Sequence, residues 1–209
     1  MEVNRLSKDR AVDHVDFFTP EDKPYGLTYG QWTVKWWQWA LSAPKAVNPL
    51  LDDTGENASL NQTGPVWFLA GTFGENKIPR RSCSIPQNKA ILFPVINYEM
   101  NELENPNIKT EPDLIKHVTE DIDDITVKEA TIDGKVVPIY RIASDPSIFS
   151  LNINHDNCIG VGGGDTEAAA DGYWVFLKPP FQGKHHIYFH GACSGGTRNA
   201  SAEYHLVVP

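Results

Sequence analysis

The first strong pattern along the chain is the segment TYGQWTVKWWQWALSA at residues 28–43, where apolar positions recur with a helical period. On a helical wheel its polar residues form one narrow wedge, and tryptophan and other apolar side chains fill the rest. Pro44 ends the predicted helix, because proline cannot continue the hydrogen-bonding pattern. We expect this helix to be covered on most sides, by its own domain, by a partner or by both. The polar wedge consists of Gln31, Lys35, Gln38 and Ser42.

Three later segments are apolar without alternation: VWFLAG at 66–71, KAILFPVIN at 89–97 and YWVFLK at 173–178. Continuous runs of this length, rich in β-branched and aromatic residues, are typical of strands that are covered on both faces. Pro94 should lie at a bulge or a strand end, because it cannot donate a hydrogen bond to a neighbouring strand.

The remaining pattern predicts a second short helix, two hairpins and a loop. The helix begins at Thr110, and Asp133-Gly134 is a strong two-residue hairpin turn. The glycine-rich stretch 157–172 predicts a long loop, and the segments 185–192 and 202–208 predict a terminal hairpin. The apolar side of the second helix consists of Leu114, Ile115, Val118, Ile122 and Ile125.

These elements predict a mainly β protein: an antiparallel β-sandwich, of jelly-roll or Ig-like type, decorated by the tryptophan-rich helix and the second short helix. Residues 1–27 are polar and interrupted by Pro20 and Pro24, so we expect an N-terminal arm there. Residues 28–209 are then a single β-sandwich domain, since no linker divides them.

Composition narrows the function classes. The chain has 209 residues, and a hydrophobic content of 41% with 22% charged residues is that of a globular protein. A net charge of -9 opposes nucleic-acid binding. No apolar stretch approaches the ~18–20 residues of a transmembrane segment. The first residues lack the apolar core of a secretory signal, so a cytoplasmic location is the default, and an extracellular one applies if a signal was removed.

The three cysteines, at 83, 158 and 193, form no CxxC pair. Free thiols are the simpler interpretation, and one disulfide with a spare thiol is the alternative for an exported protein.

The terminal hairpin carries the candidate metal ligands. Strand alternation directs His186 and His190 to the outer face of its first strand, and Glu203 and His205 to the outer face of its second. Two imidazoles and a carboxylate can bind Zn²⁺ or Cu²⁺. The two histidines of the first strand are roughly 13 Å apart, so one of them would join Glu203 and His205. The alternative is a polar, solvent-facing side of a half-buried hairpin.

Other motifs are less specific. The run GVGGGD at 160–165 lacks the GK[ST] ending of a phosphate loop, and the acidic turn at 52–57 does not match EF-hand spacing. Cys193 and His190 lack an evident acid to orient the imidazole, so no catalytic residue is expected. The tryptophan residues could form a sugar-stacking platform, although a stripe this broad is more typical of core or interface packing.

Four segments together resemble an uncharacterised family of bacterial and archaeal proteins with a W-x-x-x-W-W-x-W-A-x-S-x-P helix and a GPVWFLAGTFG strand. They are YGLTYGQWTVKWWQWALSAPKAVNPLLDDTG, GPVWFLAGTFG, RRSCSIPQNKAILFPVIN and DGYWVFLKPPFQGKHHIYFHG. The resemblance covers residues 25–99 and 171–208 and implies no activity, because none is established for that family. Its members often have a cysteine at the position of Ala58, so the resemblance leaves Cys83 without an expected partner.

Three functions remain open. The first is a non-enzymatic structural or binding domain that self-associates or holds a protein partner through apolar surface. The second is a metal-binding protein or metalloenzyme that uses the histidine-rich hairpin, and the third is a carbohydrate-binding module. Metal analysis separates the first two, and sugar binding tests the third.

Overall fold

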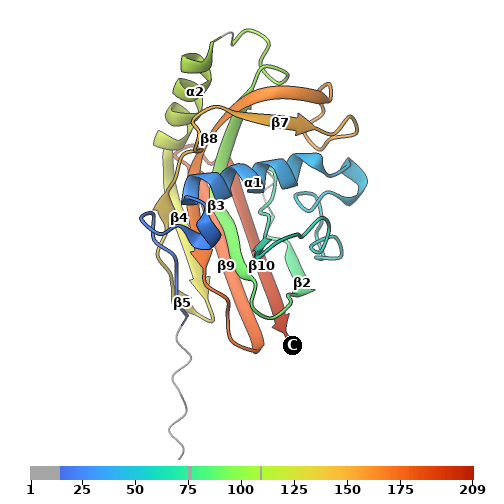
Figure 1. Cartoon of the computed structure of the whole chain (residues 1–209), viewed down its shortest axis with the longest axis vertical. Coiled ribbons are helices and arrows are strands. Elements are labelled where there is room, and N and C mark those ends of the chain that lie inside the picture. The colour runs from blue at the N-terminus through green and yellow to red at the C-terminus, as the bar shows by residue number, and fades with distance from the viewer. Residues whose placement is uncertain (1–14, 75–76, 109) are drawn as a thin grey trace, which may run out of the picture.

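The computed structural model describes residues 15–74, 77–108 and 110–209 of the chain. They form two five-stranded sheets and two α-helices (Figure 1). The first sheet has the order β1-β3-β8-β6, and β7 pairs with β8 beside that path. Its strands are β1 (Val66–Phe68), β3 (Ala90–Asn101), β6 (Tyr140–Arg141), β7 (Phe149–Ile153) and β8 (Gly164–Leu177).

The second sheet has the order β2-β10-β9-β4-β5 and contains the terminal hairpin. Both sheets are mixed, because β1 runs parallel to β3 and β2 runs parallel to β10. The expectation of purely antiparallel sheets was therefore wrong, although the prediction of a mainly β protein with two short helices is confirmed. This strand order does not establish a jelly-roll or an Ig-like topology. The strands are β2 (Arg80–Ser84), β4 (Ile125–Ile132), β5 (Lys135–Val136), β9 (Gly183–Cys193) and β10 (Asn199–Val208).

The first sheet is the middle layer of three, and this position explains its continuous apolar runs. One face of β3 and β8, with Leu92, Trp174 and Phe176, packs against α1 (Tyr29–Ser42). The opposite face, with Phe93 and neighbouring apolar residues, packs against the inner face of the second sheet. Every side chain in the apolar runs 90–96 and 174–177 therefore meets apolar surface, whichever way the pleat directs it.

The helix α1 begins and ends as the sequence predicts. The Thr28 side chain accepts a hydrogen bond from the backbone of Gln31, whose side chain accepts one from the backbone of Thr28. All of its tryptophans are buried, and Trp36 donates a hydrogen bond from Nε1 to the Leu69 carbonyl, 2.9 Å away. The fold thus covers most of this helix within one chain. Self-association stays a prediction, and α1 itself does not require it.

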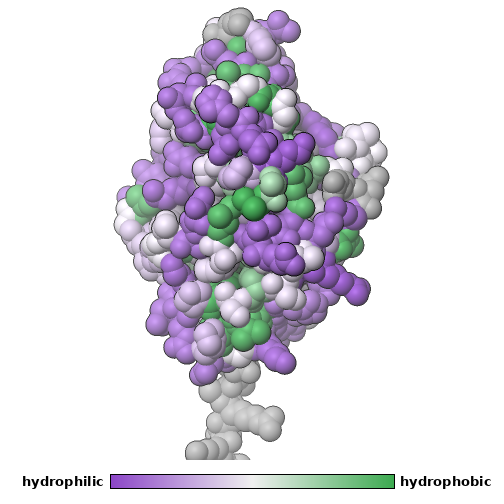
Figure 2. All heavy atoms as spheres, turned by 90° about the vertical axis from the view of Figure 1, so that its right-hand side faces the viewer, coloured by the Kyte–Doolittle hydropathy of each residue, from purple (hydrophilic) through white to green (hydrophobic). Residues whose placement is uncertain are grey.

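The view in Figure 2 shows one side of the molecule, where hydrophobic residues form several patches separated by hydrophilic side chains. Neither α-helix of the described residues is long and apolar enough to cross a membrane.

The second helix and the hairpins also follow the sequence, except that two residues predicted for the apolar side of the helix do not serve it: Ile115 is exposed, and Ile125 begins β4. The helix α2 (Glu111–Asp123) begins after Thr110 and packs against β3 and β8 through Leu114 and Val118. Asp133 and Gly134 connect β4 to β5, with positive φ angles at both residues.

The predicted loop at 157–172 was too long, because β8 begins at Gly164. Its small residues pair with β3 and β7, where tertiary contacts stabilise a strand that local preference does not favour. The predicted strand at 66–71 is shorter than expected and ends at Phe68.

The described part of the predicted arm, residues 15–27, lies against β8. Phe17 forms a bridge with Leu177, and the Phe18 backbone donates to the Phe176 carbonyl. The rest of that predicted arm, residues 1–14, lies outside the described residues.

Candidate functional sites

The register of the terminal hairpin gathers three of the four predicted metal ligands. His205 of β10 lies directly opposite His186 of β9, and Glu203 precedes His205 by two residues on the same face. We call these three residues the HEH cluster. Their nearest ligand atoms all lie within 4.8 Å of one another. The Glu203 Oε1 atom is 3.0 Å from Nε2 of His186 and 3.2 Å from Nε2 of His205.

The fourth predicted ligand, His190, lies apart from the HEH cluster. It pairs with Ser201, four residues along the hairpin from His186, and borders a shallow depression with Ile78 and Asn199. The sequence left open which histidine would join His205, and the structure places His186 there. His186 is the partner because of the register, which sets the residues that lie opposite each other on the two strands. Alternation within one strand does not determine that register.

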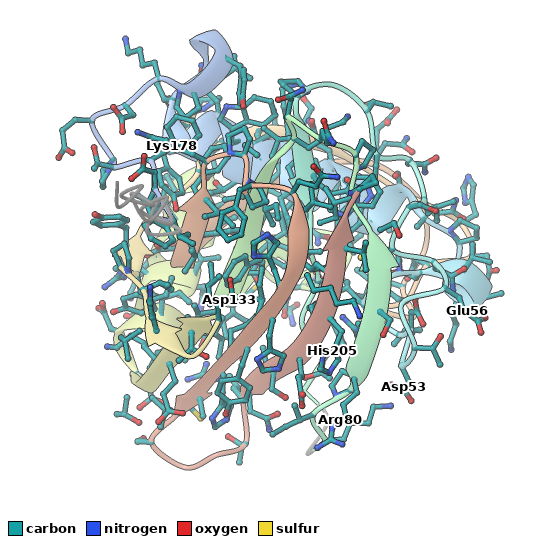
Figure 3. All side chains as sticks on the ribbon, turned by 90° about the horizontal axis from the view of Figure 1, so that it is seen from below. Asp53, Glu56, Arg80, Asp133, Lys178 and His205 are labelled. Atoms are coloured by element: carbon teal, nitrogen blue, oxygen red, sulfur yellow. The ribbon has the colours of Figure 1, made fainter. Side chains whose placement is uncertain are left out.

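Two neighbouring groups orient the HEH cluster. The Arg80 guanidinium on β2 is paired with the other Glu203 oxygen, Oε2, at 3.2 Å. Figure 3 shows Arg80 near His205 at this outer face of the sheet. The Asp133 carboxylate in the β4–β5 turn accepts a hydrogen bond from the His186 backbone at 2.7 Å. The hydrogen bond from His186 and the charge of Arg80 lower the pKa of Glu203, so its side chain is a carboxylate at neutral pH.

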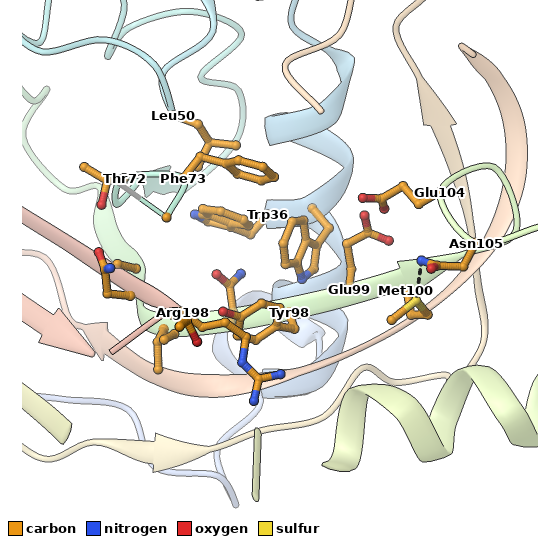
Figure 4. A pocket seen from close by; sticks show the side chains of 17 residues that line it. Trp36, Leu50, Thr72, Phe73, Tyr98, Glu99, Met100, Glu104, Asn105 and Arg198 are labelled. Carbon is orange, nitrogen blue, oxygen red and sulfur yellow. Dashed lines mark hydrogen bonds between the residues drawn. The ribbon is translucent and has the colours of Figure 1, made fainter. Parts of the chain in front are cut away.

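A separate cavity of about 280 Å³, the α1 pocket, lies between α1, the far half of β3 and the segment before β10. Its volume is close to the lower end of the ~300–1,000 Å³ range of small-molecule sites. Figure 4 shows Glu99 and Glu104 close together at one end, and Leu50 and Phe73 toward the other. The aromatic side chains in its wall are Trp36, Trp37, Phe73 and Tyr98.

Two of the residues that line the α1 pocket, Trp37 and Asn97, each have a buried hydrogen-bond donor without a partner. Nε1 of Trp37 and Nδ2 of Asn97 are both buried atoms without a hydrogen bond in the described structure. Nearly all buried polar groups in proteins are paired, so two such donors on one pocket are unusual. Trp67 and Trp174 also have unpaired indole nitrogens, but neither lines the α1 pocket.

The carboxyl groups of Glu99 and Glu104 lie beside one another in the same pocket. Nδ2 of Asn101 donates to both side chains, at 3.0 Å to Glu99 Oε2 and 2.6 Å to Glu104 Oε2. Burial and the adjacent Glu104 raise the pKa of Glu99 well above its usual range. The pair can therefore both accept and donate hydrogen bonds.

The α1 pocket was not predicted from the sequence. One signal was present: beyond the apolar run of β3, Asn97 and Glu99 alternate with Tyr98 and Met100, which directs two polar side chains to one face. Their meeting with Trp37 depends on how the helix lies across the sheet, and the sequence pattern does not specify that position.

The weaker motifs have structural explanations. The Asp52 carboxylate accepts hydrogen bonds from the backbones of Thr54, Gly55 and Asn57, so it stabilises a turn. The Cys193 thiol contacts Thr197 and the Arg198 backbone instead of His190. All three cysteines are free thiols. All six tryptophans are buried, so none presents an open sugar-stacking platform.

The comparisons with known proteins do not place this chain in a family. No family model matches it, and no curated protein matches it. Among solved structures, a chain from one described as PbICP-C in complex with falcipain-2 shares 11% sequence identity, with a TM-score of 0.30. The match covers 70% of this chain and 100% of that chain. A TM-score this low supports no conclusion about fold or function.

Proposed function

We propose that this protein is a non-enzymatic binding domain that holds a small, uncharged, hydroxyl-rich ring compound, such as a monosaccharide, in the α1 pocket. The observation that carries the proposal is that two residues lining this pocket, Trp37 and Asn97, each have a buried donor nitrogen without a partner, Nε1 and Nδ2. Leaving a buried donor unpaired costs about 1–3 kcal/mol. Both nitrogens are closed to water in the ligand-free pocket, so a small adjustment of the wall on binding would let ligand oxygens accept from them and remove that cost.

The other end of the pocket favours a hydroxyl group. The carboxyl pair of Glu99 and Glu104 offers acceptor oxygens and, when Glu99 is protonated, a donor. A hydroxyl group can match both, because it donates one hydrogen bond and accepts others. A ligand with several hydroxyl groups therefore fits the donors on one side and the carboxyl pair on the other.

Charge and shape favour a neutral ring. An anion would be repelled by the carboxyl pair, and the guanidinium of Arg198 offers it no free positive charge, because it is already paired with Asp121 and Asp124. The aromatic walls, including Phe73 and Tyr98, offer apolar surface to the ring carbons. Sugars combine an apolar ring face with hydroxyl groups at its edge, which is the complement of this lining.

Binding can be tested by tryptophan fluorescence and calorimetry with glucose, galactose, mannose, N-acetylglucosamine and myo-inositol. We expect at least one of these compounds to bind with a Kd of about 1 mM or tighter. Trp37→Phe removes the indole donor and Asn97→Leu removes the amide. Each should weaken binding roughly tenfold, which is the ~1.4 kcal/mol scale of one hydrogen bond.

The matched control is Trp67→Phe, since Trp67 is also a buried indole with an unpaired nitrogen but lies outside the pocket. It should leave the affinity unchanged. Absence of binding across the panel at about 10 mM would overturn the proposal, because affinity weaker than this gives less than ~3 kcal/mol of binding free energy. Equal losses in all three variants would also contradict it.

A further inference from the structure

We propose that the HEH cluster, His186, Glu203 and His205, binds one divalent transition-metal ion, Zn²⁺ or Cu²⁺. This site is independent of the α1 pocket, and none of its three residues lines that pocket. The metal would be held on the outer face of the terminal hairpin by two imidazole nitrogens and one carboxylate oxygen.

The distances fit a tetrahedral ion. Zn²⁺ binds imidazole nitrogen at about 2.0–2.1 Å and carboxylate oxygen at about 2.0–2.2 Å, so two ligand atoms of a tetrahedral site are about 3.3 Å apart. The Glu203 oxygen already lies 3.0 Å from one imidazole nitrogen and 3.2 Å from the other. The two nitrogens are within 4.8 Å of each other, so a small rotation of one ring brings all three atoms onto an ion.

The protonation chemistry also balances. In the metal-free cluster, Nε2 of both rings points at Glu203 Oε1. A proton that Nε2 donates to Glu203 in the metal-free cluster moves through solvent to Nδ1, or is released to solvent if the ring is doubly protonated, and the ion then takes the Nε2 lone pair of each neutral ring. No proton or electron has to be supplied by another group.

The surroundings position the ligands. The Arg80 guanidinium holds Glu203 Oε2 and leaves Oε1 directed at the two imidazoles. Metal-binding carboxylates are commonly held by such a second hydrogen bond. The half-exposed rings of His186 and His205 leave one side of the ion open to water, which would complete four-coordination.

Calorimetric titration of the untagged, chelator-treated full chain with ZnCl2 and CuCl2 tests this site. We expect one ion per chain at micromolar affinity for at least one of the two metals. His186→Ala, His205→Ala and Glu203→Gln should each weaken binding at least tenfold. Circular dichroism without metal should show the same fold for all variants, since these side chains lie on the sheet surface.

His190→Ala is the matched control, because His190 lies on the same strand and face as His186 but outside the cluster. It should bind metal as the wild type does. The proposal fails if the wild type takes up neither ion at about 100 μM, or if His190→Ala loses affinity as much as His205→Ala does. A fluorescence response of the α1 pocket to sugars would be unaffected by either result, so the two proposals can fail separately.

Discussion

At the scale of single residues, the carboxyl pair of Glu99 and Glu104 costs electrostatic free energy in the folded protein. Desolvation, then the hydrogen bond and charge of Glu104, raise the pKa of Glu99. Between its unfolded and folded pKa values, the folded protein binds more protons than the unfolded chain. The stability that protonated Glu99 contributes is complete below its unfolded pKa of about 4.3, and it is lost as the pH rises through the folded pKa.

Glu99→Gln removes this titration and keeps the size of the side chain. We therefore expect the variant to unfold at a higher urea concentration than the wild type at neutral pH, with the advantage shrinking as the pH falls toward about 4. Urea unfolding across pH 4–8 measures it. Glu102→Gln, at an exposed residue of the following turn, serves as the control and should follow the wild-type curve. Parallel curves for the wild type and Glu99→Gln would show that Glu99 titrates normally.

At the scale of elements, α1 is stabilised by packing more than by helix propensity. It contains four tryptophans and a mid-helix Thr33, which are not strong helix formers. Trp36 is completely buried, and its ring meets that of Trp174 at 5.5 Å in an edge-to-face contact. The helix is thus held by the sheet on which it lies.

Trp36→Ala should lower the free energy of unfolding by about 3–5 kcal/mol, because it leaves a large cavity between α1 and the first sheet and removes the hydrogen bond to Leu69. Lys35→Ala, at the adjacent exposed position, should change it by less than about 0.5 kcal/mol. Thermal and urea unfolding measure both variants. Equally small effects would mean that α1 is not docked as described.

At the scale of the whole molecule, the two sheets approach one another closely at Gly191. A Cβ atom added there would lie 2.5 Å from Cβ of Ile96 and 2.9 Å from the carbonyl oxygen of Val95. Glycine at this position of β9 therefore permits the contact between β9 and β3. Further along the interface, Phe93 and Phe189 stack with ring centroids 4.9 Å apart.

Gly191→Ala should force the sheets apart and lower the free energy of unfolding by about 1–3 kcal/mol or more, the usual cost of overpacking. Gly195→Ala provides the comparison, because a Cβ there meets no atom within 4 Å and the residue has no positive φ. Its stability should stay near that of the wild type. If Gly191→Ala unfolds at the wild-type midpoint, the sheets do not pack as closely as described.

The hydrophobic pattern predicted both α-helices, the buried central strands and the terminal hairpin. Residues within or next to these elements specify where they begin, end or turn: Thr28 caps α1, Pro44 ends it, and Asp133-Gly134 forms the turn of a hairpin. The same pattern predicted a loop where β8 begins, because the small residues at 164–172 show no strand preference of their own. Pairing with two neighbouring strands makes that segment a strand.

The same distinction, between what a local pattern specifies and what tertiary packing decides, applies to the candidate sites. Alternation along two strands determined that His186, His190, Glu203 and His205 share an outer face, since side chains alternate on any strand. The tertiary structure alone selected His186 as the neighbour of His205, because register depends on how two distant segments pair. It also created the α1 pocket, where Trp37 from a helix meets Asn97 and Glu99 from a strand. No local sequence pattern specifies this contact, because it arises from the packing of the helix layer on the sheet.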